Sequence, residues 1–166
     1  MISAQREARV TTDDVTRALD ESGGQYEVLP HSHTESALAE AEALGIDPAE
    51  VGKTLVLSVP EGYVRALVPA NCRVDLRKVR EVVGGGKKHV HLATEDDLSR
   101  DYSEFELGAV PPVGGSRRDR VILDRRLAER ESVVVEAGSH DRSVRIPTAE
   151  LVRVARAEVA DICQEE

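Results

Sequence analysis

Aromatic residues are almost absent from this chain: they make up 2% of its 166 residues, with no tryptophan and a single phenylalanine, Phe105. The core must therefore be built from valine, leucine, isoleucine and alanine. Proteins that hold single-stranded nucleic acid stack its bases on aromatic side chains, so recognition of that kind is disfavoured. No apolar run approaches the length of a membrane span, and we expect no contact with a membrane.

Cysteine is also scarce. Cys72 and Cys163 lie far apart, and neither belongs to a CxxC pattern. Two such residues are typical of free thiols in a reducing cytosol rather than of a disulfide framework. The first residues, Met1 to Val10, lack the hydrophobic segment of a signal peptide. We therefore expect a cytoplasmic protein.

Basic residues are outnumbered by acidic ones, 22 against 31, and the formal net charge is −9. Binding to DNA, or to nucleic acid without specificity, needs an electropositive face and is disfavoured. Two local groups of basic residues have two interpretations: a surface neutralised by nearby acids, or a phosphate-binding rim near the loop at 108–112. The groups are Arg73, Arg77, Lys78, Arg80, Lys87 and Lys88, and Arg117, Arg118, Arg120, Arg125 and Arg126.

The composition, 40% hydrophobic and 32% charged, is that of a globular protein, and the length suits one domain with a real core. Neither an internal repeat nor a linker divides the chain. We expect a single domain over residues 1–166, with residues 1–10 frayed.

Strand and helix signals are mixed along the chain without strict alternation. Apolar runs predict strands at 26–29, 53–59, 63–68, 89–92, 120–123, 132–136 and 144–146. Capping residues and helical spacing predict helices from Thr12 to Gly23, from Thr34 to Gly45, from Asp75 to Val83, after Thr94, and from Thr148 to about Ile162. Several connections are too short for a parallel crossover, Pro60-Glu61-Gly62 among them. The sequence therefore predicts an α+β domain with a mostly antiparallel, barrel-like mixed sheet flanked by helices.

Two features carry chemistry. Lys53 opens the apolar strand 51–59, where a charge is costly unless something pairs with it or uses it. A lysine at a strand end commonly extends to water, but its ammonium can also hold a phosphate or an ester carbonyl. The second feature is the loop 108–114, whose Pro111 and Pro112 restrict the backbone and remove two N–H groups. It is either an ordinary turn or a rigid frame in which the N–H groups of Gly108, Ala109 and Val110 bind a carbonyl oxygen and stabilise an oxyanion.

Other patterns are weaker. The pairs His31/His33 and His89/His91 each put two rings on one face of an extended segment, as a zinc site would, but no cysteine pair or HExxH supports a metal. Residues 84–88 follow a predicted helix and lack the order of a phosphate-binding loop, so we interpret them as a plain loop. The run 139–141 reads Ser-His-Asp, but a catalytic triad meets in space rather than in consecutive residues.

Taken together, these residues resemble the YbaK/prolyl-tRNA-synthetase-associated domain family of aminoacyl-tRNA editing deacylases. No single motif is specific, but their order and spacing are, and the likeness runs from about Tyr26 to Ile162. Its parts are residues 26–31, Thr34 and the alanine-rich helix after it, residues 51–56, Gly108 with Pro112, and residues 121–124, 134–138 and 150–151.

The resemblance implies a strongly curved, mostly antiparallel sheet in a mixed α/β domain. It implies hydrolysis of the ester between a small, wrongly attached amino acid and the 3′ adenosine of a tRNA. It further implies that Lys53 helps to position the substrate, that the backbone of Gly108–Pro112 contacts the aminoacyl group, and that no metal or other cofactor is required.

We therefore expect a trans-editing hydrolase that removes alanine, cysteine, serine or threonine from tRNA(Pro) or a related tRNA. Its partners would be the acceptor end of an aminoacyl-tRNA and an aminoacyl-tRNA synthetase. Binding energy alone rejects a small wrong amino acid poorly, which is why such a second, hydrolytic site is useful. The residues expected to act in catalysis are Lys53, Gly108, Ala109 and Val110, and those expected to bind substrate are His31, Thr34, Pro111, Pro112, Gly138 and His140.

Two alternatives stay open. The same pocket could bind aminoacyl-tRNA or a nucleotide-like ligand without turnover, or the His-x-His pairs could serve a metal-dependent hydrolase.

Overall fold

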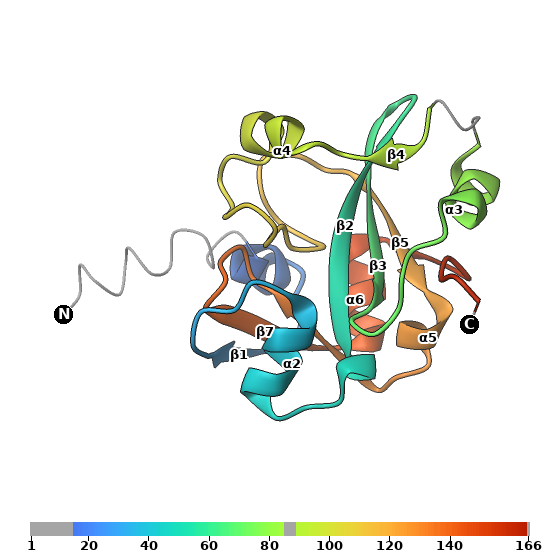
Figure 1. Cartoon of the computed structure of the whole chain (residues 1–166). Helices are drawn as coiled ribbons and strands as arrows, with labels where there is room; N and C mark the ends of the chain where they lie inside the picture. The colour runs from blue at the N-terminus through green and yellow to red at the C-terminus, as the bar shows by residue number, and fades with distance from the viewer. Residues whose placement is uncertain (1–14, 85–88, 166) are drawn as a thin grey trace.

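The computed structural model describes residues 15–84 and 89–165 (Figure 1). The strands are β1 (Glu27–Pro30), β2 (Val51–Val59), β3 (Gly62–Pro69), β4 (His91–Leu92), β5 (Arg120–Asp124), β6 (Ser132–Glu136), β7 (Arg142–Pro147) and β8 (Glu158–Ala160). The helices are α2 (Ala37–Leu44), a 3-10 turn η1 (Pro48–Glu50), α3 (Leu76–Val83), α4 (Glu95–Asp101), α5 (Arg125–Ala128) and α6 (Thr148–Ala155), and residues 15–21 are helical too.

One mixed sheet joins all the described strands, in the order β1-β7-β6-β2-β3-β5-β8, with β4 paired to β2. The long central pair is the hairpin of β2 and β3, in which Lys53 lies opposite Val68 and Val59 opposite Gly62. The pairings β1–β7, β6–β7 and β2–β4 are also antiparallel, whereas β2–β6, β3–β5 and β5–β8 are parallel. The α+β class and the mostly antiparallel mixed sheet are therefore confirmed. Closure into a barrel is not confirmed, because the strand order of the described residues ends at β1 and β8.

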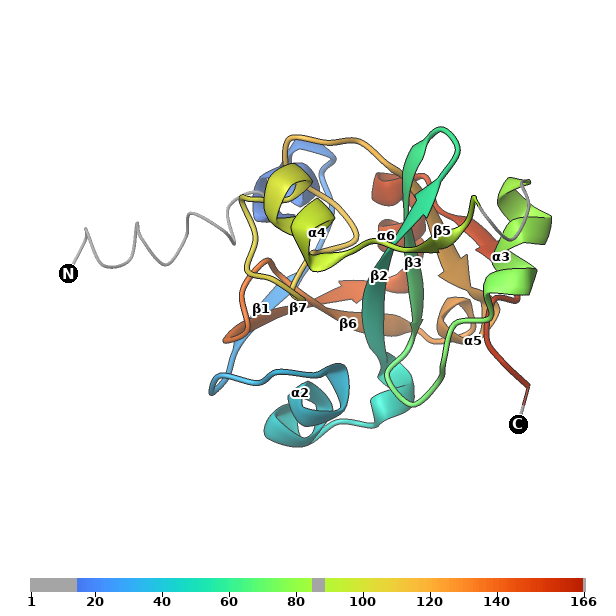
Figure 2. The ribbon, with the colours of Figure 1, turned by 45° about the horizontal axis from the view of Figure 1, so that its top comes forward.

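The core is aliphatic, as the lack of aromatic residues requires. One cluster fills the space between the sheet, the helix at 15–21, α5 and α6, with Leu19, Leu127 and Leu151 fully buried. A second cluster packs α3 against β2, β3 and β5 around Val79 and Ile122. Figures 1 and 2 both show α2 and α4 at opposite ends of the face that β2 presents, so that this strand runs between them.

Local chemistry explains where several helices begin. The Ser36 hydroxyl accepts from the Ala39 N–H and caps α2, so this helix begins slightly later than Thr34. Asp75 caps α3 with bonds from Arg77 and Lys78, and Thr94 forms a capping box with Asp97 at the start of α4. The predicted helix start at Thr12 lies outside the described residues, as does the loop after Gly84 up to residue 88.

The end of the chain differs from the prediction. The helix that begins at Thr148 does not reach Ile162, because Arg156 takes a left-handed conformation with φ 52° and ends α6 at Ala155. The chain then forms β8, which pairs in parallel with β5. The short helix α5 was not predicted, and its four residues are capped by Asp124. Ile162 is still buried, but it reaches the core from an extended segment.

Two expectations about composition can be compared with the described residues. Cys72 and Cys163 are both free thiols. No helix in the ranges 15–84 and 89–165 is both long and apolar enough to cross a membrane.

Gly52 lies at the parallel contact between β2 and β6, where only Val51 and Gly52 pair with Val134 and Val135. A Cβ added at Gly52 would lie 3.0 Å from the Val133 Cγ1 atom and 3.3 Å from the Val135 Cγ1 atom. We expect Gly52→Ala to lower the free energy of unfolding by about 1–3 kcal/mol, the usual cost of overpacking a core. Urea denaturation measures this loss.

Gly24→Ala is the matched control. Its added Cβ would approach the Glu150 Oε2 atom at 3.2 Å, the far end of a flexible side chain that can move aside. Equal losses in the two variants would contradict the view that close packing of β2 on β6 is the constraint.

Candidate functional site

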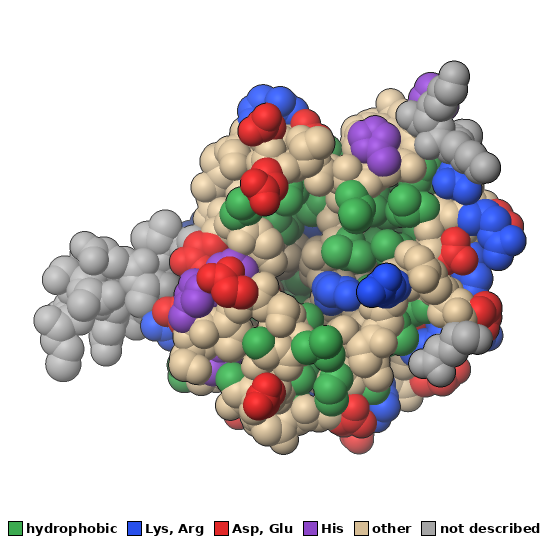
Figure 3. All heavy atoms as spheres, in the orientation of Figure 1, with side chains coloured by type: hydrophobic (Ala, Val, Ile, Leu, Met, Phe, Trp, Pro, Cys, Tyr) green, Lys and Arg blue, Asp and Glu red, His purple; other side chains and the backbone are tan. Residues whose placement is uncertain are grey.

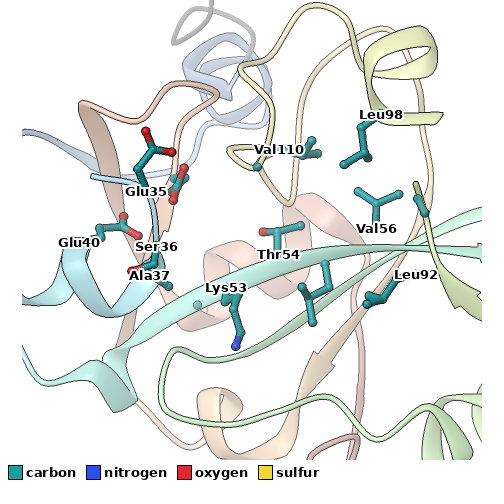
Figure 4. Close-up of a pocket in the computed structure, with 15 residues that line it drawn as sticks. Glu35, Ser36, Ala37, Glu40, Lys53, Thr54, Val56, Leu92, Leu98 and Val110 are labelled. Atoms are coloured by element: carbon teal, nitrogen blue, oxygen red, sulfur yellow. The ribbon is translucent and has the colours of Figure 1, made fainter. Parts of the chain in front are cut away.

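A cavity of about 380 Å³ opens in front of β2. Its walls are the start of α2, the first half of β2, Leu98 of α4, Gly108 and Val110 of the loop after α4, and Glu136 at the end of β6. Figure 3 shows the hollow, with acidic and histidine side chains gathered at one side of its rim and basic and apolar side chains elsewhere around it. Figure 4 shows Glu35 and Glu40 on one side of the cavity, Val56, Leu98 and Val110 on the other, and Thr54 between them.

Lys53 is the third residue of β2. It lines the cavity and is partly buried. Its ammonium donates to the Cys72 carbonyl oxygen at 2.9 Å and forms no ion pair with any carboxylate of the described residues. Burial is the main reason why the pKa of Lys53 lies below its usual value. The cation that the sequence singled out is thus held by one carbonyl and remains available to an anionic or carbonyl-bearing ligand.

The loop contributes backbone groups to the same cavity. Gly108 and Val110 line it, and among the described residues neither of their N–H groups has an acceptor. The prediction for Ala109 needs correction, because its N–H donates to the Glu106 carbonyl oxygen at 2.9 Å and cannot also bind substrate. Pro111 is a buried residue of the loop and is not among the residues that line the cavity.

Arg65 of β3 holds this loop in place. Its guanidinium donates to the carbonyl oxygens of Pro111 at 2.9 Å, Gly114 at 3.1 Å and Arg117 at 3.2 Å. Its Nε also donates to the carboxylate of Asp119 at 3.1 Å, and only 2% of Arg65 is exposed. A planar group with five donors can tie a segment together in this way, and a lysine could not.

Aromatic side chains complete the support of the loop. The hydroxyl of Tyr102 donates to Asp119 at 2.6 Å, and the Arg65 guanidinium lies 5.4 Å from the centre of the Tyr102 ring. Tyr102, Phe105 and Val110 pack in one cluster with Val56 of β2. Three of the four aromatic residues of the chain, Tyr63, Tyr102 and Phe105, therefore pack in the cluster that includes Val110 of the loop. Burial, followed by the bond to Asp119, raises the pKa of the Tyr102 hydroxyl well above its usual value.

The role of Arg65 was not predicted from the sequence, although its position is unusual for a charged residue. It lies between Val64 and Ala66 in the middle of an apolar strand, where a charge is as costly as at Lys53.

The other predicted substrate-binding residues are not among those that line the cavity. His140 Nε2 donates to the Leu107 carbonyl oxygen at 2.7 Å, and its ring lies next to Gly108. The N–H of Thr34 donates to the His140 carbonyl oxygen at 2.9 Å, and the Gly138 carbonyl accepts from Glu106 at 2.9 Å. His31 Nε2 lies 2.9 Å from the Ser143 hydroxyl. Pro112 is buried in the loop as well, so this set supports the cavity from outside.

Two buried glutamates line the cavity and were not predicted. Glu40 of α2 is fully buried, and its Oε2 accepts from the Ser143 hydroxyl. Glu136 at the end of β6 has 13% of its side chain exposed. Burial raises the pKa of Glu40 to about 7, and burial together with repulsion from Glu40 and other carboxylates raises the pKa of Glu136 to about 9. The only feature of the sequence that could have indicated this site is the position of Glu136 at the end of an apolar strand.

Metal binding finds no support in the arrangement of these side chains. Within residues 15–84 and 89–165, no three His, Cys, Asp or Glu residues come close enough to hold a metal ion. His33 pairs instead with Glu35 at 2.6 Å, and His91 Nδ1 donates to the Leu92 carbonyl oxygen at 3.2 Å. The alternative of a hydrolase built on the His-x-His pairs therefore has no geometric basis in these segments.

Comparison with known proteins identifies relatives along most of the chain. Residues 31–154 match the family model described as the aminoacyl-tRNA editing domain. The chain is 26% identical over 157 residues to the multifunctional Ser/Thr-tRNA deacylase ProXp-y of Escherichia coli K12, covering 92% of each chain. It is 25% identical over 143 residues to EbsC of Enterococcus faecalis, named as a candidate Cys-tRNA(Pro)/Cys-tRNA(Cys) deacylase, covering 86% of this chain and 85% of that one.

A solved structure named as a candidate trans-editing enzyme for prolyl tRNA synthetase superposes with a TM-score of 0.82. Its sequence is 28% identical, and the superposition covers 93% of this chain and 98% of that chain.

The support of the loop by Arg65 is testable. We expect Arg65→Met to lower the free energy of unfolding by about 3–5 kcal/mol, because buried Asp119 loses its ion pair with Arg65 and three loop carbonyls lose their donor. Limited proteolysis of the segment 108–118 should accelerate as the carbonyl contacts are lost. Arg120→Met is the control, since Arg120 pairs with Glu158 at the surface, and it should cost at most about 1 kcal/mol. Equal protection of the loop in both variants would contradict the assignment.

The raised pKa of Glu136 predicts a pH dependence of stability. Between the unfolded value near 4.5 and the folded value of about 9, the folded protein keeps a proton that the unfolded chain has released. The contribution of Glu136 to the free energy of unfolding is therefore complete below the unfolded pKa. It is lost as the pH rises towards the folded pKa, by at most about 1.4 kcal/mol per pH unit. Glu136→Gln should flatten the fall in unfolding free energy between pH 5 and pH 9. Parallel curves for the two proteins, from urea denaturation at each pH, would show that Glu136 is not responsible.

Proposed function

The chain belongs to the aminoacyl-tRNA editing domain family, and on that premise we propose that it hydrolyses mischarged aminoacyl-tRNA in trans, using the cavity in front of β2. The observation that carries the proposal is that Lys53 lines the same cavity as Gly108 and Val110, whose N–H groups have no acceptor among the described residues. These groups come from segments far apart in the sequence, and together they suit an ester carbonyl beside a phosphorylated or hydroxyl-rich group.

The reaction requires water to attack the ester carbonyl, an oxyanion to form, and the ribose oxygen to leave. The N–H groups of Gly108 and Val110 are suited to stabilise the oxyanion, because the loop is rigid and they need no rearrangement. The ammonium of Lys53 is suited to bind the 3′ end of the tRNA as a point charge. An aminoacyl ester is already activated, so orientation of water and these electrostatic contacts suffice without a protein nucleophile.

Side chains that could act as nucleophiles at the cavity give no support to a covalent route. The hydroxyl of Ser36 is used to cap α2. Within the described part of the chain, no histidine lines the cavity to activate Thr54. A direct attack of water therefore fits the lining better than an acyl-enzyme.

The substrates that we propose are alanine, cysteine, serine or threonine esters of tRNA(Pro) or a related tRNA. The relatives named above as Ser/Thr-tRNA and Cys-tRNA deacylases support small amino acids. The solved structure named for prolyl tRNA synthetase supports tRNA(Pro) and a synthetase partner. We further propose that the chain, as a single domain, contacts only the acceptor end of the tRNA and works in the cytoplasm.

Lys53 provides the sharpest test. We expect Lys53→Ala to slow deacylation of a confirmed substrate at least about 100-fold, the order of loss seen when one preorganised electrostatic contact is removed. Lys53→Met keeps the apolar stem and should be equally inactive, since the ammonium is the group that matters. A panel of mischarged tRNAs, assayed by release of the amino acid, supplies the measurement.

Thermal unfolding of both variants checks that the fold is intact. Full activity in a folded Lys53→Met protein would refute the role of the lysine. Tight binding of aminoacyl-tRNA by the wild type without turnover on any member of the panel would favour the non-catalytic binding module instead.

A further inference from the structure

Glu40 and Glu136 bring two carboxyl groups to one wall of the cavity from separate elements, α2 and β6. Glu40 is 0% exposed, and its Oε1 atom has no hydrogen-bond partner among the described residues. The Oε2 atom of Glu136 is likewise buried and without a partner. Leaving a buried polar atom unpaired is costly, so two such atoms on side chains that line one cavity indicate that a ligand completes the site.

The surroundings of these carboxyl groups contain no compensating cation. Neither Glu40 nor Glu136 forms an ion pair with a lysine or arginine of the described residues, and the Lys53 ammonium is directed to the Cys72 carbonyl instead. The charged groups that act on Glu136 are Glu40, Glu106 and Glu35, all of the same sign. The ring of His140 is the exception, with its unpartnered Nδ1 atom 3.5 Å from Glu136 Oε2. Among the described residues, these carboxyl groups thus have the Ser143 hydroxyl and the His140 ring beside them, but no lysine or arginine.

A primary ammonium carries one positive charge and three N–H donors, which match the two free carboxyl oxygens. A hydroxyl group supplies one donor and no charge. We propose that Glu40 and Glu136 form a subsite for the α-ammonium group of the aminoacyl ester, an inference that rests on the deacylase function proposed above. When the ammonium enters, the proton that keeps Glu136 neutral leaves to solvent, and the ion pair takes its place.

The rest of the cavity is consistent with this orientation of the substrate. The acidic wall lies opposite the apolar side chains of Val56, Leu98 and Val110, which suit a small amino-acid side chain (Figure 4). The N–H groups of Gly108 and Val110 remain for the ester carbonyl. The amine, the side chain and the carbonyl group on the substrate Cα then each contact a different part of the cavity. The ligand class is an L-α-aminoacyl ester with a free amine, and N-acylated esters are excluded.

The test compares two non-hydrolysable ligands that differ only at the group in question. They are 3′-alanylamino-3′-deoxyadenosine, with an α-ammonium, and its lactoyl counterpart, with a hydroxyl in the same place. We expect the wild-type protein to bind the alanyl ligand about 10- to 100-fold more tightly, the range for a hydrogen-bonded charge. Glu136→Gln and Glu40→Gln should each show a reduced preference for the alanyl ligand, because each variant keeps one of the two carboxyl groups.

Glu158→Gln is the matched control, because Glu158 lies on β8 and pairs with Arg120 at the surface. It should keep the wild-type ratio. The ratio of the two affinities is insensitive to a general loss of structure, so a merely structural role of Glu136 would lower both affinities and leave their ratio unchanged. That result, or a wild-type protein that binds both ligands equally, would overturn the proposal.

Hydrolysis distinguishes this inference from the proposed function. Binding of the alanyl ligand can be selective whether or not any ester is hydrolysed, so the affinity ratio judges the subsite by itself. A wild-type protein that deacylates Ala-tRNA(Pro) and lactyl-tRNA(Pro) at equal rates would confirm the deacylase and reject the ammonium subsite.

Discussion

One buried guanidinium holds the functional half of this molecule together. Arg65 rises from the middle of β3 and binds three backbone carbonyls of the segment 111–117, as well as the carboxylate of Asp119. No strand pairing joins this loop to the sheet, so its position depends on these bonds and on the packing of Val110 and the nearby aromatic rings against Val56 of β2. Arg65 thereby helps to hold in place the loop whose Gly108 and Val110 line the same cavity as Lys53. A buried charge is tolerated there because each of its three nitrogen atoms donates to an acceptor.

The cavity separates charges in a way that suits a small polar substrate. Its acidic wall comes from α2 and β6, its cation from β2, and its free N–H groups from the loop. Lys53 and the glutamates do not neutralise one another, since the ammonium is engaged with the Cys72 carbonyl. Opposite charges that are held apart at one site keep their capacity to bind different parts of a ligand. The raised pKa of Glu136 and the lowered pKa of Lys53 have the same physical cause, which is partial removal from water.

Much of this arrangement could be predicted from the sequence, where local chemistry decides it. The hairpin at Pro60-Glu61-Gly62 and the caps at Asp75 and Thr94 are short-range signals, and the structure has all three. Lys53 and Gly108 could be predicted to share a site because a charge is costly in an apolar strand and a Gly/Pro loop with almost no polar side chains is unusual. The strand β8 could not be predicted, because apolar residues near Val159 suit a helix as well, and only the open edge of β5 decides between them. The roles of Arg65, Glu40 and Glu136 depend on contacts across the fold that no local pattern contains.

The most direct test of the central claim is a crystal structure with 3′-alanylamino-3′-deoxyadenosine bound. The account predicts the alanyl carbonyl oxygen within hydrogen-bonding distance of the Gly108 or Val110 N–H, with the ribose beside Lys53. An alanyl group bound outside this cavity, with Lys53 and the loop unoccupied, would contradict it.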